Sequence, residues 1–356
     1  MTETMQQILA HFQLDAAPVS CERYGFGHIN ETYLVVTEHG TRYILQKVNH
    51  HIFRNVPGLM QNIEAVTAHL AKQVSDSRQV LTLIKTFDDT TYCVVDGGYW
   101  RVYVFVEDSI CLQKPETPED FYQSAVAFGN FQQMLADFPA ATLHEIIPNF
   151  HNTRDRYRIF HEVLAKDPLG RAQEVQSEID FVLAREKEAS TVVELLETGE
   201  LPLRVTHNDT KLNNVMLDAE TRTALCVIDL DTVMPGSSLY DYGDSIRFGA
   251  ATGDEDEQNL SKIEMSLALF ETYTRGFLAA CPGLTPLEIR MLPMGAKLMT
   301  LECGLRFLTD YLDGDHYFAN RRPGQNRDRA RTQFKLVADM EAKWEQMAEI
   351  VQKLSK

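Results

Sequence analysis

The sequence lacks several features that would place the protein in a special structural class. No apolar run approaches the roughly 20 residues that a membrane-spanning helix needs. The first residues, MTETMQQILAHFQ, contain neither the basic region nor the apolar stretch of a secretory signal. The six cysteines form no C-x-x-C pair, which favours reduced thiols over disulfides or a zinc site. We therefore expect a cytoplasmic globular protein without a membrane partner.

Positive charge is also scarce. The chain has 34 Lys and Arg residues against 51 Asp and Glu residues, which gives a net charge of −17. This balance argues against a nucleic-acid partner, and it means that a polyphosphate ligand must be met by local positive charge and metal. The 356 residues exceed one typical domain and suggest two lobes. The sequence does not fix the oligomeric state, and we favour a monomer.

The most informative stretch runs from Arg204 to Thr232 and reads RVTHNDTKLNNVMLDAETRTALCVIDLDT. Its alternating start and its β-branched end predict two strands around a polar loop. His207, Asp209 and Asn214 stand in the order H-x-D-x-x-x-x-N, the spacing of kinase catalytic loops. In such loops the Asp receives the acceptor hydroxyl and the Asn holds a metal. Asp229 follows the second strand and suits Mg²⁺, although such a pattern also arises by chance in polar turns.

A glycine-containing turn precedes a hairpin near the N-terminus. Gly25 and Gly27 lie in GFGHIN, where glycines would let backbone amides approach phosphates. Asn30 replaces the third glycine of G-x-G-x-x-G, and a plain hairpin turn explains the pattern equally well. Runs around 33–36 and 43–47, separated by His39-Gly40, predict the two strands of the hairpin.

The second hairpin strand carries a lysine of the kind that holds nucleotide phosphates in kinases. Gln46 and Lys47 are adjacent and lie on opposite faces of the strand, so only one can point into a cleft. We favour Lys47 because of its charge. The helix predicted over 57–73 supplies Glu64 as its candidate partner, although a solvated surface Glu is an equally good interpretation.

Three more strands are predicted over 79–106, and the last runs into Glu107 and a Pro-containing linker. We place the domain boundary near residue 108 and expect the backbone at Glu107 to meet the adenine. Helical patterns then follow at about 117–135, 152–165, 171–198, 258–280, 285–312 and 328–354.

Two groups of charged residues in this second part allow a structural and a functional interpretation. Asp241 and Asp244 suit helix caps or hydrogen bonds to the catalytic loop better than direct substrate contacts. Glu302, Arg306 and Asp310 share one helical face. They form either a surface ion-pair ladder or a polar wall that hydrogen-bonds sugar hydroxyls.

The motifs THNDTKLNNVM, VIDLDTVMPG and DYGDSIRFG resemble those of the aminoglycoside phosphotransferase and choline kinase branch of the protein-kinase-like fold. Within that branch, GFGHINETY and ECGLRFLTDYLDGDHYF are most similar to the N-acetylhexosamine 1-kinases, and the resemblance spans nearly the whole chain. It implies an α+β, two-lobed protein-kinase-like fold. A small β-rich nucleotide-binding lobe would cover residues 1–108, and a larger, mainly helical lobe with the catalytic loop and sugar site would cover 109–356.

The resemblance also implies a reaction, namely ATP-dependent phosphorylation of the anomeric C1 hydroxyl of N-acetylglucosamine or N-acetylgalactosamine. Asp209 would be the catalytic base, and Asn214 and Asp229 would bind Mg²⁺. The resemblance further implies sugar contacts from His28, Arg306, Asp310 and Tyr317.

Some features of the sequence depart from the protein-kinase pattern. Asp229-Leu-Asp231 replaces D-F-G, and the absence of an A-P-E segment argues against a protein kinase. A kinase of another small hydroxyl acceptor, of the aminoglycoside, choline or homoserine type, stays open. Two further alternatives are a metal-dependent phosphohydrolase and a non-catalytic nucleotide-binding module.

Overall fold

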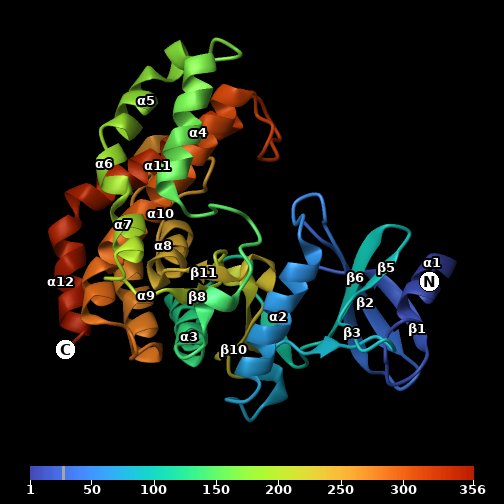
Figure 1. Ribbon diagram of the computed structural model, residues 1–356. Coiled ribbons are helices and arrows are strands. Elements are labelled where there is room, and N and C mark those ends of the chain that lie inside the picture. The colour runs from blue at the N-terminus through green and yellow to red at the C-terminus, as the bar shows by residue number, and fades with distance from the viewer. Residues whose placement is uncertain (26–28) are drawn as a thin grey trace. The chain divides into compact units, whose positions relative to one another are not determined.

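The computed structural model describes residues 1–25 and 29–356. The chain divides into two compact units, a β-rich first unit and a helix-rich second unit (Figure 1). The first contains Met1–Ile110, Thr142–Ile147 and Met216–Met234, and the second contains Cys111–Ala141, Pro148–Val215 and Pro235–Lys356. This confirms the expected α+β class. Within the described residues, none of the helices combines the length and apolar character needed to cross a membrane.

The first unit is built on a six-stranded sheet with the order β1-β2-β3-β6-β4, in which β5 also pairs with β6. The pairs are antiparallel, and the predicted hairpin forms between β2 and β3. Asp96 and Gly97 have positive φ angles of 50° and 74° and make a tight turn before β6. The strands are β1 (Pro18–Arg23), β2 (Glu31–Thr37), β3 (Arg42–Val48), β4 (Leu83–Ile84), β5 (Cys93–Val95) and β6 (Gly98–Val104).

The two faces of this sheet have different neighbours, and Figure 1 shows α1 (Glu3–Leu9) and α2 (Val56–Leu70) on opposite sides of it. Ile8, Leu9 and Phe12 pack with Leu45 and other strand residues in one buried cluster. The other face carries Gln46 and Arg101 toward α2. The period of two along a strand therefore decides which side chains reach which helix.

Two segments distant in sequence join the first unit through α2. The buried Asn62 side chain donates hydrogen bonds to the carbonyl oxygens of His144 and Val233 at 2.8 and 2.9 Å. Its own oxygen accepts the His144 N–H at 2.8 Å. These three hydrogen bonds hold the two segments against α2 specifically, because a displaced segment would leave a buried polar group unpaired. The segment that follows Asp229, up to Met234, thus belongs to the first unit.

A second sheet joins β7 (Ser109–Cys111), β9 (Val215–Asp218) and β10 (Ala224–Val227), and a short pair joins β8 (Arg204–Thr206) to β11 (Met234–Gly236). The helices of the second unit are α3 (Pro118–Met134), α4 (Thr153–Lys166), α5 (Gln176–Leu183), α6 (Glu186–Ala189), α7 (Thr191–Glu197), α8 (Ser238–Gly249), α9 (Leu267–Ala280), α10 (Pro286–Asp313), α11 (Gln325–Ala342) and α12 (Trp344–Leu354).

Local sequence explains where the longest helix begins and ends. Thr285 and Glu288 form a capping box at the start of α10, with Pro286 in its first turn. Gly314 ends the helix with a φ of 115°, a conformation that favours glycine. Within the second unit, α8 crosses α10 where Gly243 meets Gly295, and a Cβ on either would clash with the backbone of the other helix. This close approach fixes α8, which supports the catalytic loop.

Two of the predicted helices are interrupted. The helix expected over 171–198 is a short 3₁₀ turn followed by α5, α6 and α7. The helix expected over 328–354 divides at Lys343 into α11 and α12. Lys343 donates to the Met265 carbonyl at 2.9 Å and pairs with Asp339, so a tertiary contact accompanies a break that no Gly or Pro marks in the sequence.

Candidate active site

The candidate catalytic loop, residues 207–214, is called the catalytic loop after its sequence motif and follows β8 in the second unit. His207 is fully buried, and its ring meets those of Phe128 and Phe131 of α3 edge-on, at centroid distances of 5.4 and 5.9 Å. Its Nδ1 accepts the Asp209 N–H at 3.3 Å. His207 therefore anchors the loop in the core and orients the backbone at Asp209.

Two buried carboxylates of α8 hold the loop by its backbone. Asp241 accepts the N–H groups of His207 and Asn208 at 2.9 and 2.8 Å. Asp244 accepts the Thr210 N–H at 3.2 Å. These bonds confirm the interpretation that both acids fix the loop. Charged acceptors form stronger hydrogen bonds than neutral ones, so the loop has little freedom at these three residues.

The electrostatic surroundings of the two acids differ. Burial raises the pKa of Asp241, and hydrogen bonds from the loop and from Gln132, at 2.7 Å, oppose this only in part. Burial also acts to raise the pKa of Asp244, but Arg247 and Lys211 outweigh it and hold that pKa below its usual value. Asp244 is therefore a firmly ionised support of the loop, whereas Asp241 depends on its donors.

Asp209 is the exposed carboxylate of the loop, with 30% of its side chain accessible. Lys211 Nζ lies 3.0 Å from Asp209 Oδ1, and the Asn214 side chain donates to Asp209 Oδ2 at 3.0 Å. The carboxylate raises the pKa of Lys211, which stays a cation. Because the Asn214 nitrogen faces Asp209, its amide oxygen is the atom suited to a metal. Sequence reasoning missed Lys211, although its place two residues after Asp209 was a usable signal.

The acidic strand end, residues 228–232, belongs to the first unit and follows β10. Asp229 has φ 60° and ψ 57°, a left-handed conformation that costs a non-glycine residue roughly 1–2 kcal/mol. Such strain is typical of functional sites. Asp231 is buried, with 2% of its side chain exposed, and pairs with Arg101 at 2.5 Å. The two acids of the D-L-D sequence thus have different environments.

The strand residues near this end are placed differently from the sequence-based expectation. Gln46 shares a sheet face with Arg101, which donates to its Oε1 at 3.0 and 2.8 Å. Lys47 lies on the opposite face, where it is 38% exposed, 3.5 Å from Glu31 and over the ring of Trp100. The expected pairing of Lys47 with Glu64 does not form. The physical reason is strand register, since neighbouring residues point to opposite faces.

The other residues predicted to bind the nucleotide are Glu64, Glu107, Gly25 and Gly27. Glu64 accepts a hydrogen bond from Thr91, and Glu107 pairs with Arg42. Gly25 has a φ of 76° and open space around it, which suits a turn that only glycine adopts easily. Gly27 and His28 lie outside the described residues.

The predicted acceptor residues Arg306 and Tyr317 come together in the second unit. The Arg306 guanidinium lies over the rings of Phe150, Tyr317 and Phe318 at 5.2, 5.7 and 5.5 Å, and Arg306 donates to the Tyr317 hydroxyl at 3.4 Å. Tyr317 is 67% exposed. An exposed aromatic ring beside a cation can stack on a sugar and hydrogen-bond it.

Asp310 acts on the backbone of the same segment, the acceptor turn, residues 314–320. Its oxygens accept the N–H groups of His316, Tyr317 and Phe318 at 2.8–2.9 Å and the side chain of Asn326 at 2.8 Å. Asp310 is buried. This geometry argues against a surface ion-pair ladder, and it makes Asp310 a support of the turn.

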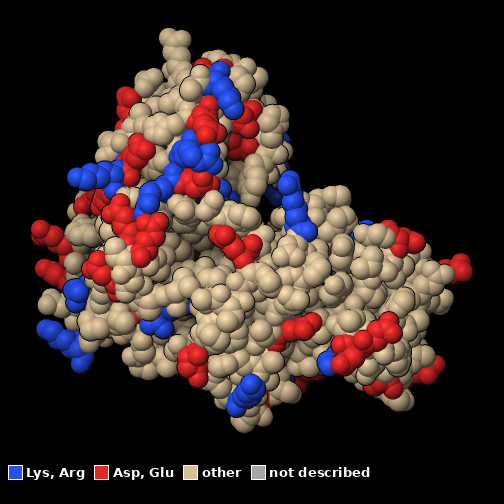
Figure 2. All heavy atoms as spheres, viewed as in Figure 1, with Lys and Arg blue, Asp and Glu red and all other residues tan. Residues whose placement is uncertain are grey.

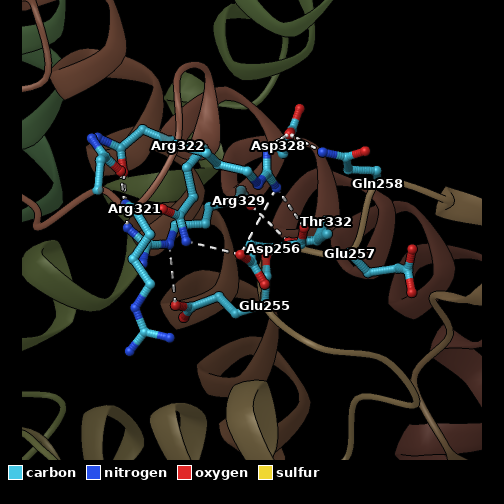
Figure 3. A network of polar contacts seen from close by, with 12 residues as sticks. Glu255, Asp256, Glu257, Gln258, Arg321, Arg322, Asp328, Arg329 and Thr332 are labelled. Carbon is cyan, nitrogen blue, oxygen red and sulfur yellow. Dashed lines mark hydrogen bonds and ion pairs between the residues drawn. The ribbon is translucent and has the colours of Figure 1, made fainter.

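A charged network continues from this turn toward the catalytic loop. Arg329 donates to the Ala319 carbonyl at 3.2 Å and lies 3.9 Å from Glu255. Arg247 joins Glu255 to Asp244 through bonds of 2.8 and 2.9 Å. Figure 3 shows Arg322 and Arg329 directed toward Glu255 and Asp256, with Arg322 also bonded to Asp328. The acceptor turn and the catalytic loop therefore share one framework.

Glu302 forms a buried pair with His151, a residue that lies in none of the sequence motifs. His151 Nδ1 lies 2.7 Å from Glu302 Oε1, and both side chains are buried. Burial by itself raises the pKa of Glu302, but His151, Arg156 and Arg306 outweigh it and lower that pKa. Glu302 is therefore an anion that balances the Arg306 charge in the interior.

Comparison with known proteins identifies the family and the fold of the chain. A model of the phosphotransferase enzyme family (APH) matches residues 20–277. The structure resembles an aminoglycoside phosphotransferase from Alicyclobacillus acidocaldarius, with 14% identity over 97% of this chain and 96% of that chain and a TM-score of 0.65. It also resembles a choline kinase from Cryptosporidium parvum, with 12% identity over 100% of both chains and a TM-score of 0.61.

A third solved structure is an amicoumacin kinase in complex with AMP-PNP and Ca²⁺, at 13% identity over 96% of this chain and 94% of that chain, with a TM-score of 0.58. At these identities the solved structures show a shared kinase-like fold. The family match is of a different kind because it covers more than half of the sequence, including the catalytic loop and the acidic strand end. The chain belongs to the phosphotransferase enzyme family.

Proposed function

We propose that the protein transfers the γ-phosphoryl group of ATP to the anomeric C1 hydroxyl of an N-acetylhexosamine, N-acetylglucosamine or N-acetylgalactosamine. The arrangement of Asp209, Lys211 and Asn214 in a rigid loop is the observation that carries the phosphotransfer. Phosphoryl transfer needs an oriented acceptor oxygen and neutralised phosphate charge. Asp209 and Lys211 provide a base and a cation 3.0 Å apart.

Each residue of the loop has a defined task in this proposal. Asp209 accepts the proton of the acceptor hydroxyl and orients its oxygen for attack. Lys211 holds positive charge beside it, where the charge of the transferred group develops. Asp241 and Asp244 hold the backbone, so that no reorganisation of the loop is needed during the reaction.

The donor set fits a hard divalent cation. Asn214 offers an amide oxygen and Asp229 a carboxylate, and oxygen ligands are those that Mg²⁺ prefers. Mg²⁺ held by these two residues would supply positive charge that neutralises the phosphates of ATP. Asp229 is held in a left-handed conformation, which supports a functional reason for its orientation. The similar amicoumacin kinase structure holds AMP-PNP and Ca²⁺, which supports this proposed use of nucleotide and metal.

The choice of a neutral sugar over a cationic acceptor depends on Arg306. Its guanidinium, together with the exposed Tyr317 ring, suits hydroxyl and amide groups, whereas it repels an ammonium group. The net charge of −17 would attract a polycation such as an aminoglycoside. Figure 2 shows, on the face viewed, separate acidic groups with Lys and Arg among them, so the negative charge there is dispersed. In this proposal, the positive charge of Arg306 at the acceptor site therefore matters more than the net negative charge of the protein.

A coupled assay of ADP formation tests the proposal. We expect turnover with N-acetylglucosamine or N-acetylgalactosamine, and little with glucose, choline or kanamycin. The methyl glycoside of the preferred sugar is the matched control because its C1 oxygen carries no proton. Turnover with that glycoside would contradict phosphorylation at C1. Stimulation by kanamycin or choline alone would contradict a sugar acceptor, and phosphate release without acceptor would favour a phosphohydrolase.

A further inference from the structure

Arg101 occupies the place in the first unit where a strand lysine was expected. In the antiparallel register of β3 and β6, Arg101 lies directly opposite Gln46. Both side chains point to the face that α2 covers, and Arg101 also reaches Met60 of that helix. The lysine of β3, Lys47, points to the other face. The face of the sheet under α2 therefore carries a cation, but the cation is Arg101 of β6 and not a lysine of β3.

The contacts of Arg101 connect three segments that are distant in sequence. Its Nη1 lies 2.5 Å from Asp231 Oδ1, and its Nε and Nη2 both donate to Gln46 Oε1. Asp231 Oδ2 accepts the Asn30 side chain at 2.5 Å, and Asn30 Oδ1 accepts the Asn49 N–H at 2.9 Å. Asn30 is the residue that ends the glycine-containing turn. One buried network thus joins Asn30, two central strands and the acidic strand end.

Because both side chains are buried, this ion pair is expected to add little to the stability of the protein. The side chains of Arg101 and Asp231 are 1% and 2% exposed. Removing two charges from water costs about as much as their attraction returns, and well-packed apolar residues often stabilise such a site equally well. The charge of Asp229 also acts on the Arg101 guanidinium. The network therefore sits beside the proposed metal ligand.

We propose that Arg101 and Asp231 form a positioning pair that holds the acidic strand end and Asn30 in register for the nucleotide. The pair fixes the residue two positions after Asp229 and, through Asn30, the end of the turn. It acts through these residues rather than by contact with the transferred group. This inference rests on the proposed use of ATP, and not on the identity of the acceptor.

A comparison of single and double variants separates positioning from mere stability. Arg101→Met and Asp231→Asn each leave one buried polar partner unmatched, so both should lower the thermal midpoint of the nucleotide-free protein. The double variant Arg101→Met/Asp231→Leu removes both charges and should regain most of the midpoint. We expect its kcat to stay about tenfold or more below that of the wild type, with weaker ATP binding. A double variant that recovers midpoint, kcat and ATP affinity together would overturn the proposal.

Three further variants sharpen the result. Arg101→Lys should retain more kcat than Arg101→Met, because a cation remains in place. Lys47→Met should lose less ATP affinity than Arg101→Met, and the reverse order would overturn the assignment. Arg78→Met is the matched control, since Arg78 pairs with Asp76 and Asp218 in the same unit. A loss of ATP affinity in Arg78→Met equal to that in Arg101→Met would also overturn it.

Nucleotide binding measured by calorimetry keeps the two proposals distinguishable. This binding measurement uses ATP alone and does not require a sugar acceptor. If the wild-type protein binds ATP but phosphorylates no N-acetylhexosamine, the acceptor assignment fails while the Arg101 comparison still stands or falls on its own data.

Discussion

The catalytic loop and the acidic strand end each present an aspartate to which we assign a role in the proposed reaction, yet they are held by opposite means. The loop is fixed through its backbone, because Asp241 and Asp244 accept main-chain N–H groups. The strand end is fixed through side chains, by the pair of Arg101 with Asp231. Backbone anchoring leaves the side chains of the loop available for chemistry. Side-chain anchoring makes the strand end dependent on residues from separate parts of the sequence.

The largest effect is expected from the side chain that the loop leaves available. Asp209→Asn keeps the size of the residue but removes the base, so kcat should fall by about 10²–10⁴-fold. ATP affinity and the thermal midpoint should change little, because the loop backbone is held by other residues. A steady-state assay with calorimetric ATP titration checks both. Near-normal turnover in a folded Asp209→Asn protein would contradict the assignment of the base.

The second largest effect concerns the anchors of the loop. Asp241→Ala leaves the buried N–H groups of His207 and Asn208 without their acceptor, at a cost of about 1–3 kcal/mol for each buried unsatisfied group. Chemical denaturation of the nucleotide-free protein measures this loss. Asp241→Asn is the control, since it keeps one acceptor oxygen and should lose less. Equal stability of the Ala variant and the wild type would show that the loop is held in another way.

A third, smaller effect should be confined to the acceptor. Arg306→Lys retains the charge but not the planar group that lies over Phe150, Tyr317 and Phe318. We expect the KM for the sugar to rise about tenfold, which corresponds to roughly 1.4 kcal/mol of binding. The KM for ATP should stay unchanged. A parallel rise in both constants would contradict a role in acceptor recognition.

The smallest effect is a pH dependence of stability in the second unit. The Glu302 pKa is lowered from 4.5 in the folded state, so its stabilising contribution is fully present above that pH. The contribution is lost as the pH falls below 4.5 through the folded-state pKa. In Glu302→Gln this dependence should disappear, and the stability difference from the wild type should shrink on acidification. Denaturation curves from neutral pH downward measure it, and a constant difference would contradict it.

Much of the local structure follows from short sequence signals. The hairpin of β2 and β3, the capping box at Thr117 that starts α3 and the turn at Asp96 are all set by neighbouring residues. The order of His207, Asp209 and Asn214 likewise predicts a kinase-type loop before any contact is known. The division of α11 from α12 at Lys343 could not be predicted, because its partner Met265 is distant in sequence.

The sequence by itself determined the α+β class, the catalytic loop and the two acids after the second strand, because propensity, period and motif spacing are local properties. Only the tertiary structure decided which cation lies on the sheet face that α2 covers. Charge favoured Lys47, but strand register turned that side chain to the other face and placed Arg101 opposite Gln46. Pairing between strands joins residues far apart in the chain, so its outcome depends on packing that no single stretch of sequence contains.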